Sequence, residues 1–478
     1  MDNTEKYHAL RAQYPEFEYV DYHYKSMDEG LRLWFDFRMG DVEFHPWAVV
    51  EQRSFLHMEG GEIDRMVFDI GMAELVSYWK CACPPKVRVL CGSLTDSQIS
   101  FWKKLYWHGL GEFFYTNGIE ETSEAYMEIA AQRPDAGACI PVAGQRDMSE
   151  AGREYLVPIG GGKDSVVTLE LLRRAGKRVR PLIMNPRGAT RECARVAGFG
   201  MDEVLVIRRT IDPVLLELNS RGYLNGHTPF SAMLAFYTRL SSALSGIPNV
   251  ALSNESSANE STVIGSSVNH QYSKSLEFEN DFREYCADET ALDCVRAGAS
   301  ATGTLTHSHT GAFNYFSFLR PLSELQIAML FSREKQYHDV FRSCNVGSKQ
   351  DIWCGHCAKC LFAYVILSPY IAPERLEAIF GKNMLDDATM RGELDQLMGM
   401  SATKPFECVG TVDEVRQALA MSMQRSYEDG RPALLKEMPL PPDHWMELSR
   451  AGAAANLNGE EYSILTQALA EACTVKND

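Results

Sequence analysis

Between residues 155 and 252, short apolar runs alternate with longer segments in which apolar residues recur at helical spacing. Strand–helix alternation of this kind predicts an α/β fold, with a doubly wound parallel sheet, helices on both faces and right-handed crossovers. In such a sheet, ligands bind beyond the carboxyl ends of the strands. The predicted strands are Tyr155–Ile159, Val179–Met184, Val204–Ile207 and Val250–Leu252, and helices are predicted after Gly162, at Thr190–Phe199 and at Phe230–Leu244.

The flanking regions have other patterns. The first 150 residues are rich in aromatic side chains, which we expect to pack in a core, and Met66–Trp79 has the spacing of a helix. A loose mixture of Pro, Gly, Asp and Ala at residues 132–153 indicates a domain boundary. The sequence predicts an aromatic-rich N-terminal domain (1–150), the α/β domain (151–343), a cysteine knuckle with a buried helix (344–370) and a helical C-terminal region (371–478).

Composition limits the class of protein. The 478 residues carry a formal net charge of −17, which argues against a nucleic acid as partner. The N-terminal residues mix charges without an apolar core, unlike a signal peptide, and the longest apolar stretch, near Leu361–Ile366, is too short to span a membrane. Thirteen cysteines in a chain without export signals indicate reduced thiols and a cytoplasmic protein.

A glycine-rich loop joins the first predicted strand of the α/β region to its helix. Glycines lack a Cβ, so the backbone can turn tightly and approach a ligand. The N–H groups of the loop and of the first helical turn have no intrahelical partners, and the helix macrodipole adds to their preference for an anion. The spacing fits neither a Walker loop nor a dinucleotide fingerprint. The loop consists of Gly160, Gly161, Gly162, Lys163, Asp164 and Ser165.

Polar side chains of several kinds gather after the fourth predicted strand, in the segments SNESSANES (253–261) and VNHQYSKS (268–275). A solvated loop rarely concentrates such different groups behind a buried strand, so we expect these segments to be functional. A turn with the sequence NGHTP (225–229) precedes a helix, and its histidine is equally consistent with a ligand contact and with a structural role. The candidate side chains are His227, Asn254, Glu255, Glu260, His270 and Lys274.

Four cysteines, Cys344, Cys354, Cys357 and Cys360, lie in the segment CNVGSKQDIWCGHCAKC. Thiolates suit tetrahedral zinc, and the CGHC sequence brings two sulfurs to one ion. The spacing also resembles that of iron–sulfur proteins, so zinc is favoured and iron stays open. Four protein sulfurs leave no coordination position for chemistry, which predicts a structural metal. We expect His356, between two of the cysteines, to be exposed.

The glycine loop resembles the pyrophosphate-binding loop (PP-loop) of the ATP pyrophosphatases, usually written SGGxDS, with Gly160 in place of the serine. Further segments are similar to one family of that superfamily, the ATP-dependent epimerases of UDP-N-acetylmuramoyl-L-alanyl-L-glutamate in peptidoglycan precursor synthesis. These segments cover most of the chain, and SNESSANES with VNHQYSKS is more specific than the loop. The others are KKLYWHGLGEFFYTNGI (103–119), NGHTP, FLRPLSELQIA (318–328), WCGHCAKC (353–360) and KPFECVGT (404–411).

The resemblance implies a PP-loop fold of the adenine nucleotide alpha-hydrolase type that binds ATP, with the N-terminal domain on the substrate side. It also implies an isomerase that adenylates the terminal L-Glu, removes its Cα proton, returns a proton to the other face and releases D-Glu, AMP and pyrophosphate. Residues Gly160–Ser165 and Asn254 would bind ATP, Asp164 would hold Mg²⁺, and Lys163 would offset phosphate charge. The base stays open among His227, Glu255, Glu260, His270 and Lys274.

Other interpretations remain. Enzymes resembling 7-cyano-7-deazaguanine synthase pair such a loop with a cysteine-rich zinc site and form an amide or nitrile, but their pattern lacks the aromatic N-terminal domain. A tRNA thiolase fits the acidic charge poorly. A zinc-stabilised, non-catalytic nucleotide sensor would be consistent with the altered residue Gly160.

Overall fold

The computed structural model describes residues 2–51, 60–133, 154–263, 265–266, 268–296, 313–424, 430–436 and 441–474. It confirms a mixed α/β protein and divides it into two compact units. The first unit contains Met1–Glu154, Leu205–Val250 and Tyr272–Tyr315, and the second contains Tyr155–Val204, Ala251–Gln271 and Phe316–Asp478. The four-part division of the sequence stays a prediction, and most of its first boundary lies outside the described residues.

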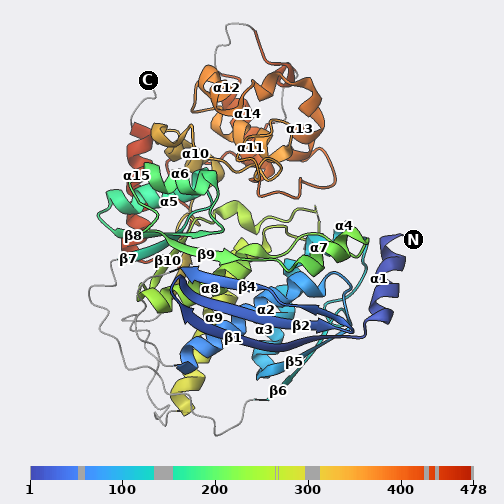
Figure 1. Ribbon diagram of the computed structural model, residues 1–478. Coiled ribbons are helices and arrows are strands. Elements are labelled where there is room, and N and C mark those ends of the chain that lie inside the picture. Colours follow the sequence, from blue (N-terminus) through green and yellow to red (C-terminus); the bar gives the residue numbers. More distant parts are fainter. Residues whose placement is uncertain are drawn as a thin grey trace. The chain divides into compact units, whose positions relative to one another are not determined.

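A mixed sheet forms the centre of the first unit, in the order β9-β4-β2-β1-β5-β6, with β3 paired to β2 (Figure 1). The pairs from β9 to β1 are antiparallel, whereas β1, β5 and β6 run parallel. The strands are β1 Glu16–Met27, β2 Gly30–Met39, β3 Val42–Phe44, β4 Trp47–Glu51, β5 Lys86–Ser93, β6 Glu128–Gln132 and β9 Leu205–Arg209.

The alternation along β2 explains how this sheet forms a core. Leu31, Leu33, Phe35 and Phe37 are buried, whereas the residues between them are partly exposed. Because successive side chains of a strand point to opposite faces, one face of β2 is apolar, and helix α2 (Gly60–Trp79) packs on β1 and β2. The other helices of this unit are α1 Asn3–Gln13, α3 Asp96–Gly109, α4 Gly111–Thr116, α7 Pro213–Ser220, α8 Phe230–Ser245 and α9 Leu276–Arg296.

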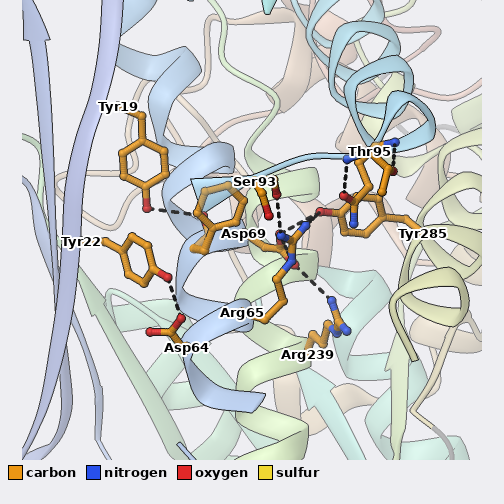
Figure 2. A network of polar contacts seen from close by, with 11 residues as sticks. Tyr19, Tyr22, Asp64, Arg65, Asp69, Ser93, Thr95, Arg239 and Tyr285 are labelled. Carbon is orange, nitrogen blue, oxygen red and sulfur yellow. Dashed lines mark hydrogen bonds and ion pairs between the residues drawn. The ribbon is translucent and has the colours of Figure 1, made fainter. Parts of the chain in front are cut away.

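A buried polar network fixes α2 within the first unit (Figure 2). The fully buried carboxylate of Asp69 accepts a hydrogen bond from Tyr285 at 2.7 Å and pairs with Arg239 at 3.2 Å and with Arg65 at 3.4 Å. Arg65 also donates to the Tyr285 hydroxyl and to the Ser93 carbonyl. The buried charge is therefore paired and hydrogen-bonded, as burial requires.

In the second unit, the strand–loop–helix–strand order expected after residue 154 is confirmed: β7 Glu154–Pro158, α5 Lys163–Arg174 and β8 Arg178–Met184. The strand order is β11-β10-β7-β8, where β10 is Asn249–Leu252 and β11 is Asn314–Ser317. The remaining helices are α6 Gly188–Val196, α10 Glu324–Phe331, α11 Ala358–Leu367, α12 Pro373–Phe380, α13 Arg391–Leu397, α14 Val412–Ser422 and α15 Gly459–Thr474. Across the described ranges, no helix combines the length and hydropathy that a membrane span requires.

Helix α10 begins at a capping box. The Ser323 hydroxyl accepts from the N–H of Gln326, whose side chain bonds back to the N–H of Ser323. Because of this capping box, the helix begins at Glu324. Pro321 disfavours helical backbone at the residue before it, Arg320. As a result, Glu324 stands in the first turn of α10, which packs against α5 and α11.

Candidate functional site

The glycine loop connects β7 to α5 as predicted. Gly161 has φ +83°, and a Cβ on it would lie 3.0 Å from the Cβ of Ala189 and 3.1 Å from the nitrogen of Thr190, so this position requires glycine. A Cβ on Gly160 would meet no atom within 4 Å. A serine would therefore fit sterically at Gly160.

Hydrogen bonds to its carbonyl groups hold the glycine loop in place. The Gly161 carbonyl accepts from the backbone N–H of Arg342 at 2.8 Å, and the Gly162 carbonyl accepts from the Ser165 hydroxyl at 3.1 Å. Gly162 caps α5 without a side-chain bond to the first helical turn. The loop thus combines a fixed backbone with a helix N-terminus, the geometry that suits an anion.

Lys163 opens α5 and is almost fully buried, with 6% of its surface exposed. Its ammonium contacts Asp164 Oδ1 at 2.5 Å and also Glu324 Oε2. Burial disfavours the charged form, but the carboxylates of Asp164 and Glu324 outweigh it and raise the pKa of Lys163. The ammonium is therefore charged beside the glycine loop.

Two carboxylates contact this ammonium, and a third lies beside them. One oxygen each from Asp164, Glu255 and Glu324 lie within 4.8 Å of one another. Burial raises the pKa of Glu324, and the Lys163 ammonium opposes that rise. Three acidic side chains and one basic one form this cluster, and carboxylate oxygens are the ligands that Mg²⁺ prefers.

Hydrogen bonds hold the main chain at two of the three acidic residues. The N–H of Glu324 donates to Oε1 of buried Glu414 at 2.7 Å, and Glu414 also accepts from the N–H of Thr411 at 2.6 Å. Buried Arg320 donates to the carbonyl of Glu255 at 2.7 Å. The segments FLRPLSELQIA and SNESSANES thus meet in the second unit.

Three other candidates of the second unit, Asn254, Glu260 and His270, have different neighbours. Glu260 pairs with buried Lys404, which also donates to the Gly410 carbonyl at 3.0 Å, so KPFECVGT anchors this glutamate. The amide of Asn254 donates to the Ser317 hydroxyl at 3.0 Å. The backbone N–H of His270 donates a hydrogen bond to the Thr262 hydroxyl.

The remaining candidates belong to the first unit. Nδ1 of His227 lies 3.3 Å from Oε2 of Glu112, and both side chains are mostly buried. Lys80, 6% exposed, donates to the carbonyls of Gly226 and His227 and to the Thr228 hydroxyl, so it fixes the turn that carries the histidine. Lys274 ends the short 3₁₀ helix Tyr272–Lys274.

The four cysteines come together as the sequence predicts. Their sulfurs all lie within 4.8 Å of one another, with Cys344 to Cys357 at 3.9 Å and Cys354 to Cys360 at 3.7 Å. A zinc tetrahedron with Zn–S bonds of about 2.3 Å has sulfur–sulfur edges of about 3.8 Å, so the spacing fits this ion. His356 is exposed, as expected, and bonds to the Cys354 carbonyl.

The structure adds residues to which the sequence analysis gave no role. Glu324, Glu414 and Arg320 support the loop cluster, and Glu112 and Lys80 support His227. The segment FLRPLSELQIA already contained Arg320 and Glu324, and its similarity to the family was the available signal.

Comparisons with known proteins identify a family. The chain matches the MurL N-terminal domain over residues 8–295 and the MurL C-terminal domain over residues 340–447. It is 37% identical over 359 residues to the UDP-N-acetyl-alpha-D-muramoyl-L-alanyl-L-glutamate epimerase of Xanthomonas oryzae pv. oryzae (strain MAFF 311018), covering 73% of either chain.

Proteins of the same name from Salinispora tropica and Micromonospora sp. are also similar. The first is 36% identical over 358 residues, covering 73% of this chain and 71% of the relative. The second is 35% identical over 352 residues, covering 72% of either chain. The two domain matches and these long alignments show that the chain belongs to the MurL family.

Proposed function

We propose that this protein is an isomerase that inverts the terminal L-Glu of UDP-N-acetylmuramoyl-L-Ala-L-Glu to D-Glu in peptidoglycan precursor synthesis, with ATP as co-substrate. Its MurL relatives carry the name of this epimerase. The observation that carries the ATP-dependent chemistry is the GGGKDS loop, where a charged, buried Lys163 and three carboxylates stand at a helix N-terminus. We further propose a PP-loop fold of the adenine nucleotide alpha-hydrolase type for the ATP-binding region.

The proposed reaction has four steps. An oxygen of the substrate α-carboxylate attacks the α-phosphorus of ATP, and pyrophosphate leaves. The resulting acyl-adenylate no longer carries the carboxylate charge, so removal of its Cα proton avoids a doubly charged enolate. A proton then returns to the other face of Cα. Water hydrolyses the adenylate to D-Glu and AMP.

The loop residues would act in the first step. The N–H groups of the loop and of the α5 N-terminus would bind the departing pyrophosphate, and the ammonium of Lys163 would offset its growing charge. Asp164 would hold Mg²⁺, which would polarise the phosphates. Asn254 is a further proposed contact to ATP.

The proton-transfer residue stays open. His227, beside Glu112, and His270 are candidates of a type that titrates near neutral pH. Glu260 pairs with Lys404, and Glu255 lies at the loop cluster, which supports binding roles for these two carboxylates. Lys274 is the fifth candidate.

We propose that the four cysteines hold a structural zinc. Metal analysis of the purified protein should find one equivalent of zinc, and Cys354→Ser should lower that content and the folding stability together. The variant Cys193→Ser removes a buried thiol outside the cluster and should keep the metal. Iron in the wild type would contradict the assignment to zinc. We also propose a cytoplasmic location and no nucleic-acid partner.

The function is tested by incubating the protein with the UDP-linked dipeptide, Mg²⁺ and ATP in deuterated water. Chiral analysis of the glutamate and analysis of the nucleotides should show D-Glu with deuterium at Cα and AMP instead of ADP. AMP without inversion would favour an amide- or nitrile-forming enzyme. Absence of both AMP and deuterium exchange would contradict an enzyme and favour a nucleotide sensor.

A further inference from the structure

Two ion pairs connect α5 with the segment that contains α10. Near the first residue of both helices, Lys163 pairs with Glu324, and near their last turns Arg174 pairs with Glu334. Both pairs therefore link the same two packed segments, but only the first contains a residue of the glycine loop.

The two pairs differ in their surroundings. The side chains of Lys163 and Glu324 are 8% and 2% exposed, whereas Arg174 is 54% exposed and Glu334 8%. Water can solvate the Arg174 guanidinium, and an ion pair of this kind contributes little. The Lys163 ammonium is removed from water, so its charge and its position depend on the carboxylates that contact it.

Glu324 is itself rigidly placed. It stands in the first turn of α10 after the Ser323 capping box, and its N–H donates to Glu414. Gly410 packs beside it, because a Cβ at that glycine would lie 2.7 Å from Glu414 Oε2 and 3.2 Å from Glu324 Cγ. The backbone and the side-chain stem of Glu324 are thus held by packing and by a hydrogen bond to another segment.

We infer that Glu324 is a positioning residue for the adenylation step. It holds the ammonium of Lys163 at the glycine loop, in the orientation in which the ammonium contacts the phosphates. The inference rests on the proposed function, because it assigns Lys163 to the phosphates of ATP. Glu324 acts through Lys163 and does not itself contact the phosphates. A catalytic charge displaced by about 1 Å loses roughly 10²-fold in rate, which sets the expected size of the effect.

The test is substrate-dependent exchange of labelled pyrophosphate into ATP, which reports adenylation without epimerisation. Wild type should exchange label. Glu324→Gln removes the charge and keeps the size, and should reduce exchange roughly 10²-fold. Glu324→Asp keeps the charge and should recover part of the rate. Glu334→Gln breaks the matched ion pair at the other ends of the helices and should exchange at nearly the wild-type rate.

A double-mutant cycle separates positioning from general damage to the fold. If Glu324 acts through Lys163, then Glu324→Gln should add no further loss in a Lys163→Met background. Independent, multiplicative losses would contradict the inference, as would equal losses in Glu324→Gln and Glu334→Gln. An effect confined to the Mg²⁺ dependence would reassign Glu324 as a cation ligand. No exchange in wild type would instead contradict the proposed function.

Discussion

Two buried lysines, Lys80 and Lys163, lie in different units of the protein and have opposite environments. Lys80, in the first unit, donates to two carbonyls and a hydroxyl, and burial lowers its pKa to about 8. Lys163, in the second unit, contacts two carboxylates, which overcome burial and raise its pKa. Both lysines are 6% exposed, so burial alone does not explain the difference.

The difference lies in the charge of the acceptors. Neutral oxygens satisfy the hydrogen bonds of an ammonium but do not compensate for its lost hydration, whereas carboxylates do both. A lysine that fixes a turn needs only the hydrogen bonds, as Lys80 does for residues 226–228. A lysine that is to meet phosphate must keep its charge, and the surroundings of Lys163 provide for that.

The largest expected effect comes from Lys163→Met. This change leaves the buried carboxylate of Glu324 and the partly exposed one of Asp164 without their ammonium. Removal of one partner from a buried ion pair costs about 3–5 kcal/mol. Urea unfolding should show this loss, together with loss of pyrophosphate exchange. Arg174→Met, at the pair on the same helix whose guanidinium is 54% exposed, should lose less than Lys163→Met does, because water already solvates that guanidinium. Equal losses would remove the distinction between the two pairs.

Magnesium should partly reverse the effect of Lys163→Met. The variant has three carboxylates without the ammonium, so a divalent cation should stabilise it more than it stabilises wild type. A ligand at 100 times its Kd adds about 2.7 kcal/mol. Thermal unfolding with and without Mg²⁺ measures the difference, and Lys163→Met/Asp164→Asn should respond less. A larger Mg²⁺ response in wild type than in Lys163→Met would contradict the cation site.

A smaller loss of stability is expected from Lys80→Met. The change leaves carbonyls of the 226–228 turn without their donor, and an unsatisfied buried acceptor costs about 1–3 kcal/mol. Urea unfolding should place the loss below that of Lys163→Met. Lys86→Met, at a half-exposed lysine of the same unit, is the control and should change stability little. A loss larger than that of Lys163→Met would reverse the comparison.

The pH dependence should show the smallest effect. The pKa of Lys80 is lower in the folded protein than its ordinary value of 10.5, so above about pH 8 the folded state binds fewer protons than the unfolded state. Its contribution to stability should therefore rise with pH from about 8 to 10.5, by at most about 1.4 kcal/mol per pH unit. Unfolding at pH 8 and 9 should show this slope in wild type and a weaker one in Lys80→Met. An unchanged slope would assign the dependence to other groups.

Local patterns determined much of this protein. The strand–loop–helix order around GGGKDS, the buried helices α8 and α11 and the Cys344–Cys360 cluster were all predictable, since each depends on residues close together in the chain. Motif similarity likewise identified the family that the domain matches show. Short-range periodicity and ligand spacing are properties of the sequence itself.

The strand pairing of the first unit was not predictable in this way. From the sequence alone, the aromatic residues before position 50 are expected in a core, and no strands are predicted for them. Phe35, Phe37 and Phe44 are indeed buried, but in a mixed sheet in which β4 pairs antiparallel with β9, more than 150 residues later in the chain. An alternating pattern predicts a strand, but it does not determine which other strand it pairs with.

The candidate site shows the same limit. Sequence placed Lys163 and Asp164 at the helix N-terminus, but the partner carboxylate Glu324 lies 161 positions away, and Glu414 another 90 beyond it. Lys80 reaches the 226–228 turn across a separation of 146 positions or more. Such contacts depend on how helices and loops pack. Tertiary structure alone therefore decided which lysine has a raised pKa and which has a lowered one.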